Sequence, residues 1–243
     1  MAGAATVVLS SLALKGVLEK SRSAFEAALG PLELRFDATQ AILERLAKGT
    51  RADLLILTAE ALEDLRKDGA VTEVRALGSS GVGLAVRAGA AKPDIGSAEA
   101  LVRALLAASS VAHSKVGASG LYFRSLIERF GIADQLKKRI VVEKGPVGLV
   151  VAAGEAEIGV QQLCELAPVR GIDIVGPFPP PLQTRTYFSA GIAAQAKNPQ
   201  AARQLIGLLT SEETRAAMIE GGMQPAADQP REIGRASCRE RVS

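Results

Sequence analysis

The chain of 243 residues contains two cysteines, one histidine and no tryptophan, and aromatic residues make up only 3% of it. Cys238 belongs to the last twelve residues, which are set apart below, so Cys164 and His113 remain. One cysteine and one histidine make neither an internal disulfide nor a Cys/His zinc site. We therefore expect no metal and no cofactor. The scarcity of aromatic rings also leaves little surface on which sugars or single-stranded nucleic acid could stack.

Long apolar runs are absent too: no stretch approaches the roughly 18 apolar residues of a membrane span, so we expect no membrane-embedded part. No basic segment precedes an apolar run at the N-terminus, where residues 6–9 already have the pattern of a strand, so no signal peptide is predicted. If Met1 is the true start, the expected location is the cytoplasm. The net charge of +3 and the lack of a basic helical face argue against nucleic acid.

The C-terminal residues 232–242 read EIGRASCRERV, which is what one frame of a common short-read sequencing adapter encodes. We interpret residues 232–243 as adapter-derived sequence outside the fold. The alternative is a natural basic tail. Without this segment the net charge falls to +2, because it holds three arginines and two glutamates.

Apolar runs and amphipathic segments alternate through the first third of the chain. Strands are expected at residues 6–9, 32–36 and 54–57, and helices at 14–29, 38–48 and 59–68. Thr58 is placed to cap the last of these helices. The alternation of strand and helix predicts a doubly wound parallel α/β layer.

Around residues 78–81 the pattern changes, and a second α/β unit follows the extended segment 82–87. Its strands are expected at 110–113, 140–142, 158–160 and 172–175, and its helices at 97–106, 119–130 and 147–153. An extended return at 184–192 leads into helices at 199–209 and 211–220. We predict two doubly wound α/β lobes joined by a two-strand hinge, with lobe 1 formed by residues 1–82 and 190–231 and lobe 2 by 83–189. The alternative is a single compact α/β domain.

The most informative segment is residues 154–162, GEAEIGVQQ, where a helix ends at glycine and a short buried strand delivers two amides at its carboxyl end. In open α/β sheets, ligands bind at that end of the strands. This segment, with VVLSSLA at 7–13, FDATQ at 36–40, RADLLIL at 51–57 and SGLY at 119–122, resembles the type II periplasmic solute-binding proteins. Within that fold the resemblance is to the molybdate-binding-like branch of ABC transporter substrate-binding proteins, and it extends over residues 5–228.

The resemblance implies a cleft that closes on a small anion, a periplasmic location and an ABC transporter permease as partner; we expect a monomer. In that family small hydroxyls and helix N-termini hold the oxyanion without a charged side chain. The resemblance places Ser10 or Ser11 at the first strand, Thr39 at the second, and Ser119 and Lys144–Gly145 at helix starts. Ser10 and Ser119 could equally cap their helices. The predicted ligand-binding set is Ser10, Ser11, Thr39, Gln40, Ser119, Gly145, Gln161 and Gln162, with His113, Lys115 and Lys144 as secondary candidates.

One departure bears on the ligand: Gln162 stands where the molybdate-binding group uses a tyrosine hydroxyl. An amide offers two donors and an acceptor, which suits a carboxylate as well as a tetrahedral oxyanion. We therefore expect an anion-selective site that is not tuned to molybdate.

Three functions remain open. A binding protein for uptake is favoured over an enzyme, and no catalytic residue is assigned. The second possibility follows from relatives of this fold that isomerise small tricarboxylates such as aconitate; His113, Glu143 and Glu165 are the bases available for proton transfer. The third is a cytoplasmic ligand sensor.

Overall fold

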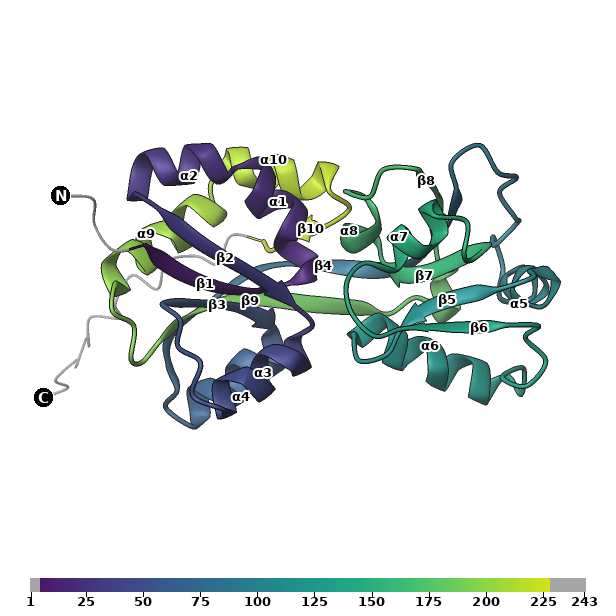
Figure 1. The fold of residues 1–243 in the computed structure, drawn as a ribbon, viewed down its shortest axis with the longest axis horizontal. Coiled ribbons are helices and arrows are strands. Elements are labelled where there is room, and N and C mark those ends of the chain that lie inside the picture. The colour runs from purple at the N-terminus through teal and green to yellow at the C-terminus, as the bar shows by residue number, and fades with distance from the viewer. Residues whose placement is uncertain (1–4, 228–243) are drawn as a thin grey trace, which may run out of the picture.

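The computed structural model describes residues 5–227, which form two α/β lobes joined by two long strands (Figure 1). Strand β4 (Val71–Arg87) runs through both lobes, and β9 (Arg185–Ala193) returns alongside it. The strand order is β2-β1-β3-β9-β4-β7-β5-β6, and β8 and β10 also pair with β4. The adapter-like residues 232–243 lie outside the described part of the chain.

Lobe 1 is built on three parallel strands with β1 in the middle. These are β1 (Thr6–Ser11), β2 (Leu32–Asp37) and β3 (Leu54–Thr58), and β9 joins β3 antiparallel. Its helical segments are η1 (Leu12–Leu14), α1 (Lys15–Lys20), α2 (Arg22–Leu29), α3 (Thr39–Ala47), α4 (Ala59–Lys67), α9 (Pro199–Leu209) and α10 (Glu212–Glu220), followed by the short β10 (Gln224–Pro225). Successive residues of β3 enter different cores: Leu54 and Ile56 pack in one cluster, Leu55 and Leu57 in another. This two-sided burial explains the continuous apolar runs in the sequence.

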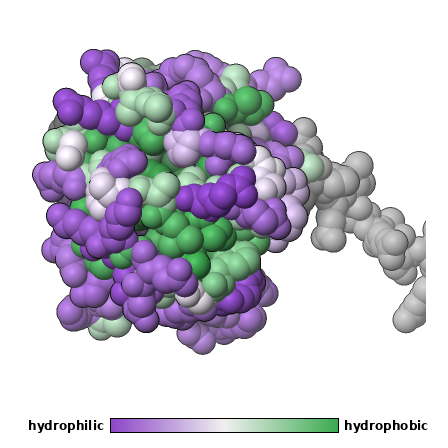
Figure 2. Space-filling model, turned by 90° about the vertical axis from the view of Figure 1, so that its right-hand side faces the viewer, coloured by the Kyte–Doolittle hydropathy of each residue, from purple (hydrophilic) through white to green (hydrophobic). Residues whose placement is uncertain are grey.

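Lobe 2 repeats the arrangement around β5 (Val111–Ser114), which lies parallel to β6 (Arg139–Val142) and β7 (Ile158–Gln162). Strands β4 and β8 (Ile172–Pro177) complete its sheet antiparallel. The helical segments are α5 (Ala98–Ala107), α6 (Ala118–Arg129), α7 (Val147–Ala152), α8 (Leu163–Leu166) and η2 (Pro180–Leu182). Viewed from the end at which α5 lies, lobe 2 shows apolar residues near the middle of a largely hydrophilic face (Figure 2).

The α/β fold class follows the prediction, with three local corrections. The single helix expected at 14–29 is broken into η1, α1 and α2, because Ser21 ends one helix and begins the next. Thr58 is the N-cap residue of α4 but its side chain makes no capping hydrogen bond. The segment 82–87 is only the second half of a strand that begins at Val71. By contrast, Ser97 caps α5, and its side chain accepts a hydrogen bond from the Ala100 N–H at 3.1 Å.

The crossing strands are fastened to each other by side chains as well as by the β-ladder that pairs Gly78 with Phe188 and Gly81 with Arg185. Gln183 binds both backbone groups of Val82: its oxygen accepts from the N–H at 2.8 Å and its nitrogen donates to the carbonyl at 2.9 Å. The predicted lobe boundaries at residues 82–83 and 189–190 fall on these strands. Within residues 5–227, no helix is long and apolar enough to cross a membrane.

Candidate functional site

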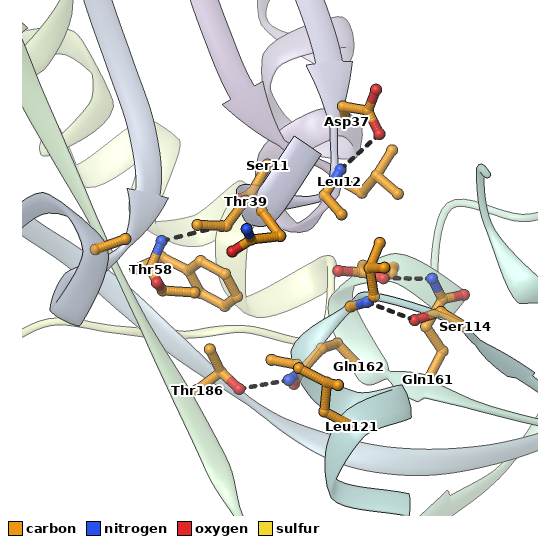
Figure 3. Close-up of a pocket in the computed structure, with 18 of the residues that line it drawn as sticks. Ser11, Leu12, Asp37, Thr39, Thr58, Ser114, Leu121, Gln161, Gln162 and Thr186 are labelled. Carbon is orange, nitrogen blue, oxygen red and sulfur yellow. Dashed lines mark hydrogen bonds between the residues drawn. The ribbon is translucent and has the colours of Figure 1, made fainter. Parts of the chain in front are cut away.

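A cavity of about 620 Å³ lies between the two lobes. Its lobe 1 wall consists of residues at the carboxyl ends of β1, β2 and β3 and at the N-termini of α3 and α4, whereas its lobe 2 wall comes from the ends of β5, β6 and β7, the start of α6, and α8 (Figure 3). Residues 184–188 connect the walls. Its volume is in the range of small-molecule sites, about 300–1,000 Å³.

Of the two serines that end β1, only Ser11 lines the cavity. Its side chain is 3% exposed, and its hydroxyl oxygen has no hydrogen-bond partner within residues 5–227. Ser10 is fully buried and donates its hydroxyl proton to the Ser11 carbonyl at 2.9 Å. Because buried polar atoms without partners are rare, the Ser11 hydroxyl is a donor available to a ligand.

Three helices, α3, α4 and α6, begin at the cavity through Ala38, Thr58 and Gly117. None of the three has a side-chain hydrogen bond at its N-cap. In α5 and α10, which begin away from the cavity, Ser97 and Ser211 provide such caps. The N-terminal end of a helix carries partial positive charge and free N–H donors, so the three uncapped ends favour an anion in the cavity.

Thr39 and Gln40, two of the residues predicted to bind the ligand, lie at the first turn of α3 and line the cavity. The Thr39 hydroxyl oxygen accepts a hydrogen bond from the Thr58 N–H at 3.3 Å, which ties the starts of α3 and α4 together. That bond does not use the hydroxyl proton of Thr39. Lys144 and Gly145 also line the cavity, at the approach to α7.

The two amides at the end of β7 line the cavity, but both are occupied by protein partners. The Gln161 oxygen accepts from the Val147 N–H at 2.7 Å, and its nitrogen donates to the Glu165 carboxylate. The Gln162 amide lies 2.6 Å from the Thr186 hydroxyl; with its oxygen facing that hydroxyl, its nitrogen donates to the carbonyls of Ser80 at 2.9 Å and Gly81 at 3.2 Å. Gln161 thus holds α7 and α8, whereas Gln162 holds the crossing strands.

Glu165, on α8, is a half-buried carboxyl in the cavity wall. Burial raises its pKa to about 7, and the hydrogen bond from Gln161 offsets part of that rise. A carboxyl with a pKa near neutrality can both accept and release a proton at physiological pH. From the sequence, Glu165 was predicted only as one of three available bases.

Four of the predicted residues do not line the cavity: Ser119, His113, Lys115 and Ser10. Ser119 is buried in the first turn of α6. The His113 ring packs 5.4 Å from that of Phe123 with Nδ1 3.0 Å from the Ser114 carbonyl oxygen, and burial lowers its pKa. Lys115 instead forms an exposed ion pair with Glu143, 3.0 Å between Nζ and each carboxylate oxygen.

The sequence did not single out several other cavity residues. Ser114 ends β5, and its hydroxyl oxygen accepts from the Gly117 N–H at 2.9 Å. Leu121 and Tyr187 are 51% and 62% exposed at the cavity. Ser114 directly follows the strand predicted at 110–113, which is a usable signal, whereas nothing in the local pattern indicates that Leu121 and Tyr187 face a cavity.

The family is established by comparison with known sequences. Residues 6–224 match the model of the bacterial extracellular solute-binding protein family, and the chain belongs to that family. An aconitate isomerase from Pseudomonas sp. is 38% identical over 233 residues, which cover 92% of this chain and 88% of the relative.

Solved structures place the fold among the type II periplasmic binding proteins. The periplasmic molybdate-binding protein of Azotobacter vinelandii superposes with a TM-score of 0.73 at 19% identity, covering 92% of this chain and all of that one. A sulfate-binding protein from Mycobacterium tuberculosis H37Rv gives 0.68 at 16% identity, covering 92% of this chain and 87% of that one. At these identities the likeness shows the fold alone.

Proposed function

We propose that this protein binds a small organic acid in the cavity between its lobes and that the lobes close on it. The observation that carries the proposal is the lobe 1 wall. There the Ser11 hydroxyl, which has no partner within residues 5–227, lies with the uncapped starts of α3 and α4. These groups supply hydrogen-bond donors and partial positive charge without a formal cation, which suits a carboxylate or another oxyanion.

The crossing strands β4 and β9 form the hinge of this movement, and the rigid bodies are lobe 1, described over residues 5–82 and 190–227, and lobe 2, residues 83–189. Leu121 and Tyr187, exposed at the cavity in this form, lose solvent contact when the lobes approach. Burial of such apolar surface favours closure by about 25 cal/mol per Å². The expected unit is a monomer.

A carboxylate is favoured over molybdate. The relative with 38% identity is an enzyme named for a tricarboxylate, whereas the molybdate-binding structure shares only 19% of residues. We propose that the bound acid is captured in the periplasm, which the match to an extracellular solute-binding family supports, and that it is delivered to an ABC permease. The second candidate is isomerisation of an unsaturated tricarboxylate of the aconitate kind, which the relative's activity and the near-neutral carboxyl of Glu165 support.

A thermal-shift screen tests the binding proposal. We expect stabilisation by aconitate and other small di- and tricarboxylates, and weaker effects from molybdate, tungstate, sulfate and phosphate. A ligand at a hundredfold excess over Kd stabilises by about 2.7 kcal/mol, which for a chain of this size raises Tm by roughly 5–10 °C. If no anion raises Tm, the binding proposal is wrong, and if only molybdate and tungstate do so, the choice of a carboxylate is wrong.

The Ser11→Ala variant tests whether the ligand binds at the lobe 1 wall. Loss of a hydrogen bond to a charged ligand costs about 1.5–3 kcal/mol, so we expect Kd to rise roughly 10–100-fold in calorimetric titrations. Ser10→Ala is the matched control, because the Ser10 hydroxyl is bonded to the Ser11 carbonyl and Ser10 does not line the cavity. Equal effects of the two substitutions would contradict the placement of the ligand at Ser11.

A further inference from the structure

Proton transfer on a bound acid requires a base that faces the cavity, and of the three that the sequence offered, only Glu165 has suitable surroundings. The Nε2 atom of His113 is buried without a partner in the described chain, and His113 is not part of the cavity wall. Glu143 does line the cavity, but Lys115 holds both of its carboxylate oxygens at an exposed position. Glu165 has neither drawback: it lines the cavity, and it forms no ion pair within residues 5–227.

The position of Glu165 is set by a chain of hydrogen bonds that starts at the backbone. The Val147 N–H donates to the Gln161 oxygen, and the Gln161 nitrogen donates to one Glu165 carboxylate oxygen. Because both ends of the Gln161 amide are used, its side chain cannot rotate without losing one bond. This arrangement orients the carboxyl, and within residues 5–227 its other oxygen makes no hydrogen bond and can meet a substrate.

A carboxylate in this wall is unfavourable for simple anion binding, since its negative charge would repel the anion that the helix N-termini attract. The acid form removes the repulsion and donates a proton. A half-buried carboxyl is thus hard to explain as a recognition group but well suited to an acid–base role.

We propose that Glu165 is the residue that moves a proton on the bound tricarboxylate, with Gln161 as its positioning residue; this rests on the isomerase activity proposed above. The ionised Glu165 takes a proton from the substrate methylene between a carboxylate and the double bond. The C–H electron pair spreads over the three-carbon allyl unit. The neutral Glu165 then returns the proton to the far end of that unit. The double bond has shifted by one position, and no oxidant, reductant or co-reactant is consumed.

Charged groups on the neighbouring elements do not account for the protonation behaviour of Glu165. The elements packed against α8 and the opposite cavity wall carry the following charged side chains: Lys15, Glu19, Lys20, Asp37, Glu60, Asp64, Glu73, Arg75, Arg87, Glu143, Lys144, Asp173 and Arg185. The pKa of Glu165 is raised by burial and is lowered only by the hydrogen bond from Gln161. Its ionisation therefore depends on how far the cavity is open to water.

The test compares Glu165→Gln with the wild-type protein, using aconitate as the probe. Glutamine keeps the size of the side chain and an acceptor for Gln161, so the fold should be retained, and Tm verifies this. Isomerisation is followed by ¹H NMR of the vinyl protons, and binding by calorimetry. We expect turnover to fall about 10²–10⁴-fold while Kd stays equal or becomes tighter. Glu128→Gln, an exposed position outside the cavity wall, is the matched control and should leave both quantities unchanged.

The pH profile and a conservative variant separate proton transfer from a structural role. Wild-type kcat/KM should rise with pH through about 7, because the base must be ionised, and this rise should be absent in Glu165→Gln. Glu165→Asp should recover part of the activity. Turnover by Glu165→Gln within about threefold of wild type overturns the assignment. Wild-type protein that binds aconitate without isomerising it overturns the catalytic role alone, whereas failure to bind any carboxylate overturns the binding proposal itself.

Discussion

The two walls of the cavity use their polar groups differently. On the lobe 1 wall, the Ser11 hydroxyl has no partner within residues 5–227, and α3 and α4 begin without side-chain caps. On the lobe 2 wall, the start of α6 is also uncapped, but Gln161, Gln162 and Ser114 are all bonded to other protein groups. The first wall is therefore suited to recognise an anion. The lobe 2 wall is suited to keep its own strands and helices, and Glu165 with them, in position. Substitutions on the first wall should weaken binding, whereas those on the second should destabilise the fold.

The largest loss of stability is expected on substitution of Gly120, where α6 meets the end of β5. A Cβ atom at this position would lie 1.9 Å from the Ser114 carbonyl oxygen, so Gly120→Ala forces the helix away from the strand. We expect a loss of more than about 3 kcal/mol in the free energy of unfolding, or failure to fold. Gly207→Ala in α9 is the matched control, because its Cβ would meet nothing within 4 Å. It should stabilise by about 0.5–1 kcal/mol, and chemical denaturation measures both. Equal stability of the two variants would contradict the tight α6–β5 junction.

The pH dependence of stability tests the burial of Glu165. Its pKa rises from 4.5 to about 7 on folding, so the acid form stabilises the fold below pH 4.5 and this contribution is lost as pH increases through 7. The free energy of unfolding of the wild type, minus that of Glu165→Gln, should fall by up to about 3 kcal/mol between pH 4.5 and 8.

Subtracting the two free energies of unfolding cancels the contributions of the other titrating groups. Glu73 and Glu26, whose pKa values are lowered by Arg203 and Arg22, affect both proteins alike, as does His113. A difference that does not change with pH would mean that Glu165 is as well hydrated in the folded protein as in the unfolded chain.

A smaller loss of stability is expected on substitution of Gln162. Gln162→Leu leaves the carbonyls of Ser80 and Gly81 and the Thr186 hydroxyl without this partner, which should cost about 1–3 kcal/mol. Thermal unfolding should show a Tm lower by roughly 2–10 °C. Gln40→Leu, at an exposed position of the opposite wall, is the control and should leave Tm nearly unchanged. A stable Gln162→Leu protein that has lost ligand binding would instead return Gln162 to the ligand set predicted from the sequence.

Much of the fold could be predicted because its signals are local. Apolar runs such as residues 54–57 indicate strands buried on both faces, and Ser97 and Ser211 lie directly ahead of helices that they cap. The first half of β4 was missed, because residues 72–76 are mostly exposed and lack a regular apolar alternation. Its strand conformation depends on pairing with β9, more than a hundred positions away in the chain.

Ser11, Thr39, Gln40, Gly145, Gln161 and Gln162 all line one cavity. The α/β pattern predicts a site at the carboxyl ends of the strands, and the family resemblance indicated which residues at those ends to choose. Their individual roles were decided by the tertiary structure. Adjacent residues of a strand point to opposite faces, so Ser11 faces the cavity and Ser10 does not. Gln161 and Gln162 form hydrogen bonds with groups on α7, α8, β4 and β9. No local sequence pattern reveals these bonds. The protonation of Glu165 likewise depends on burial by both lobes, because desolvation is a property of the assembled cavity and not of the residue.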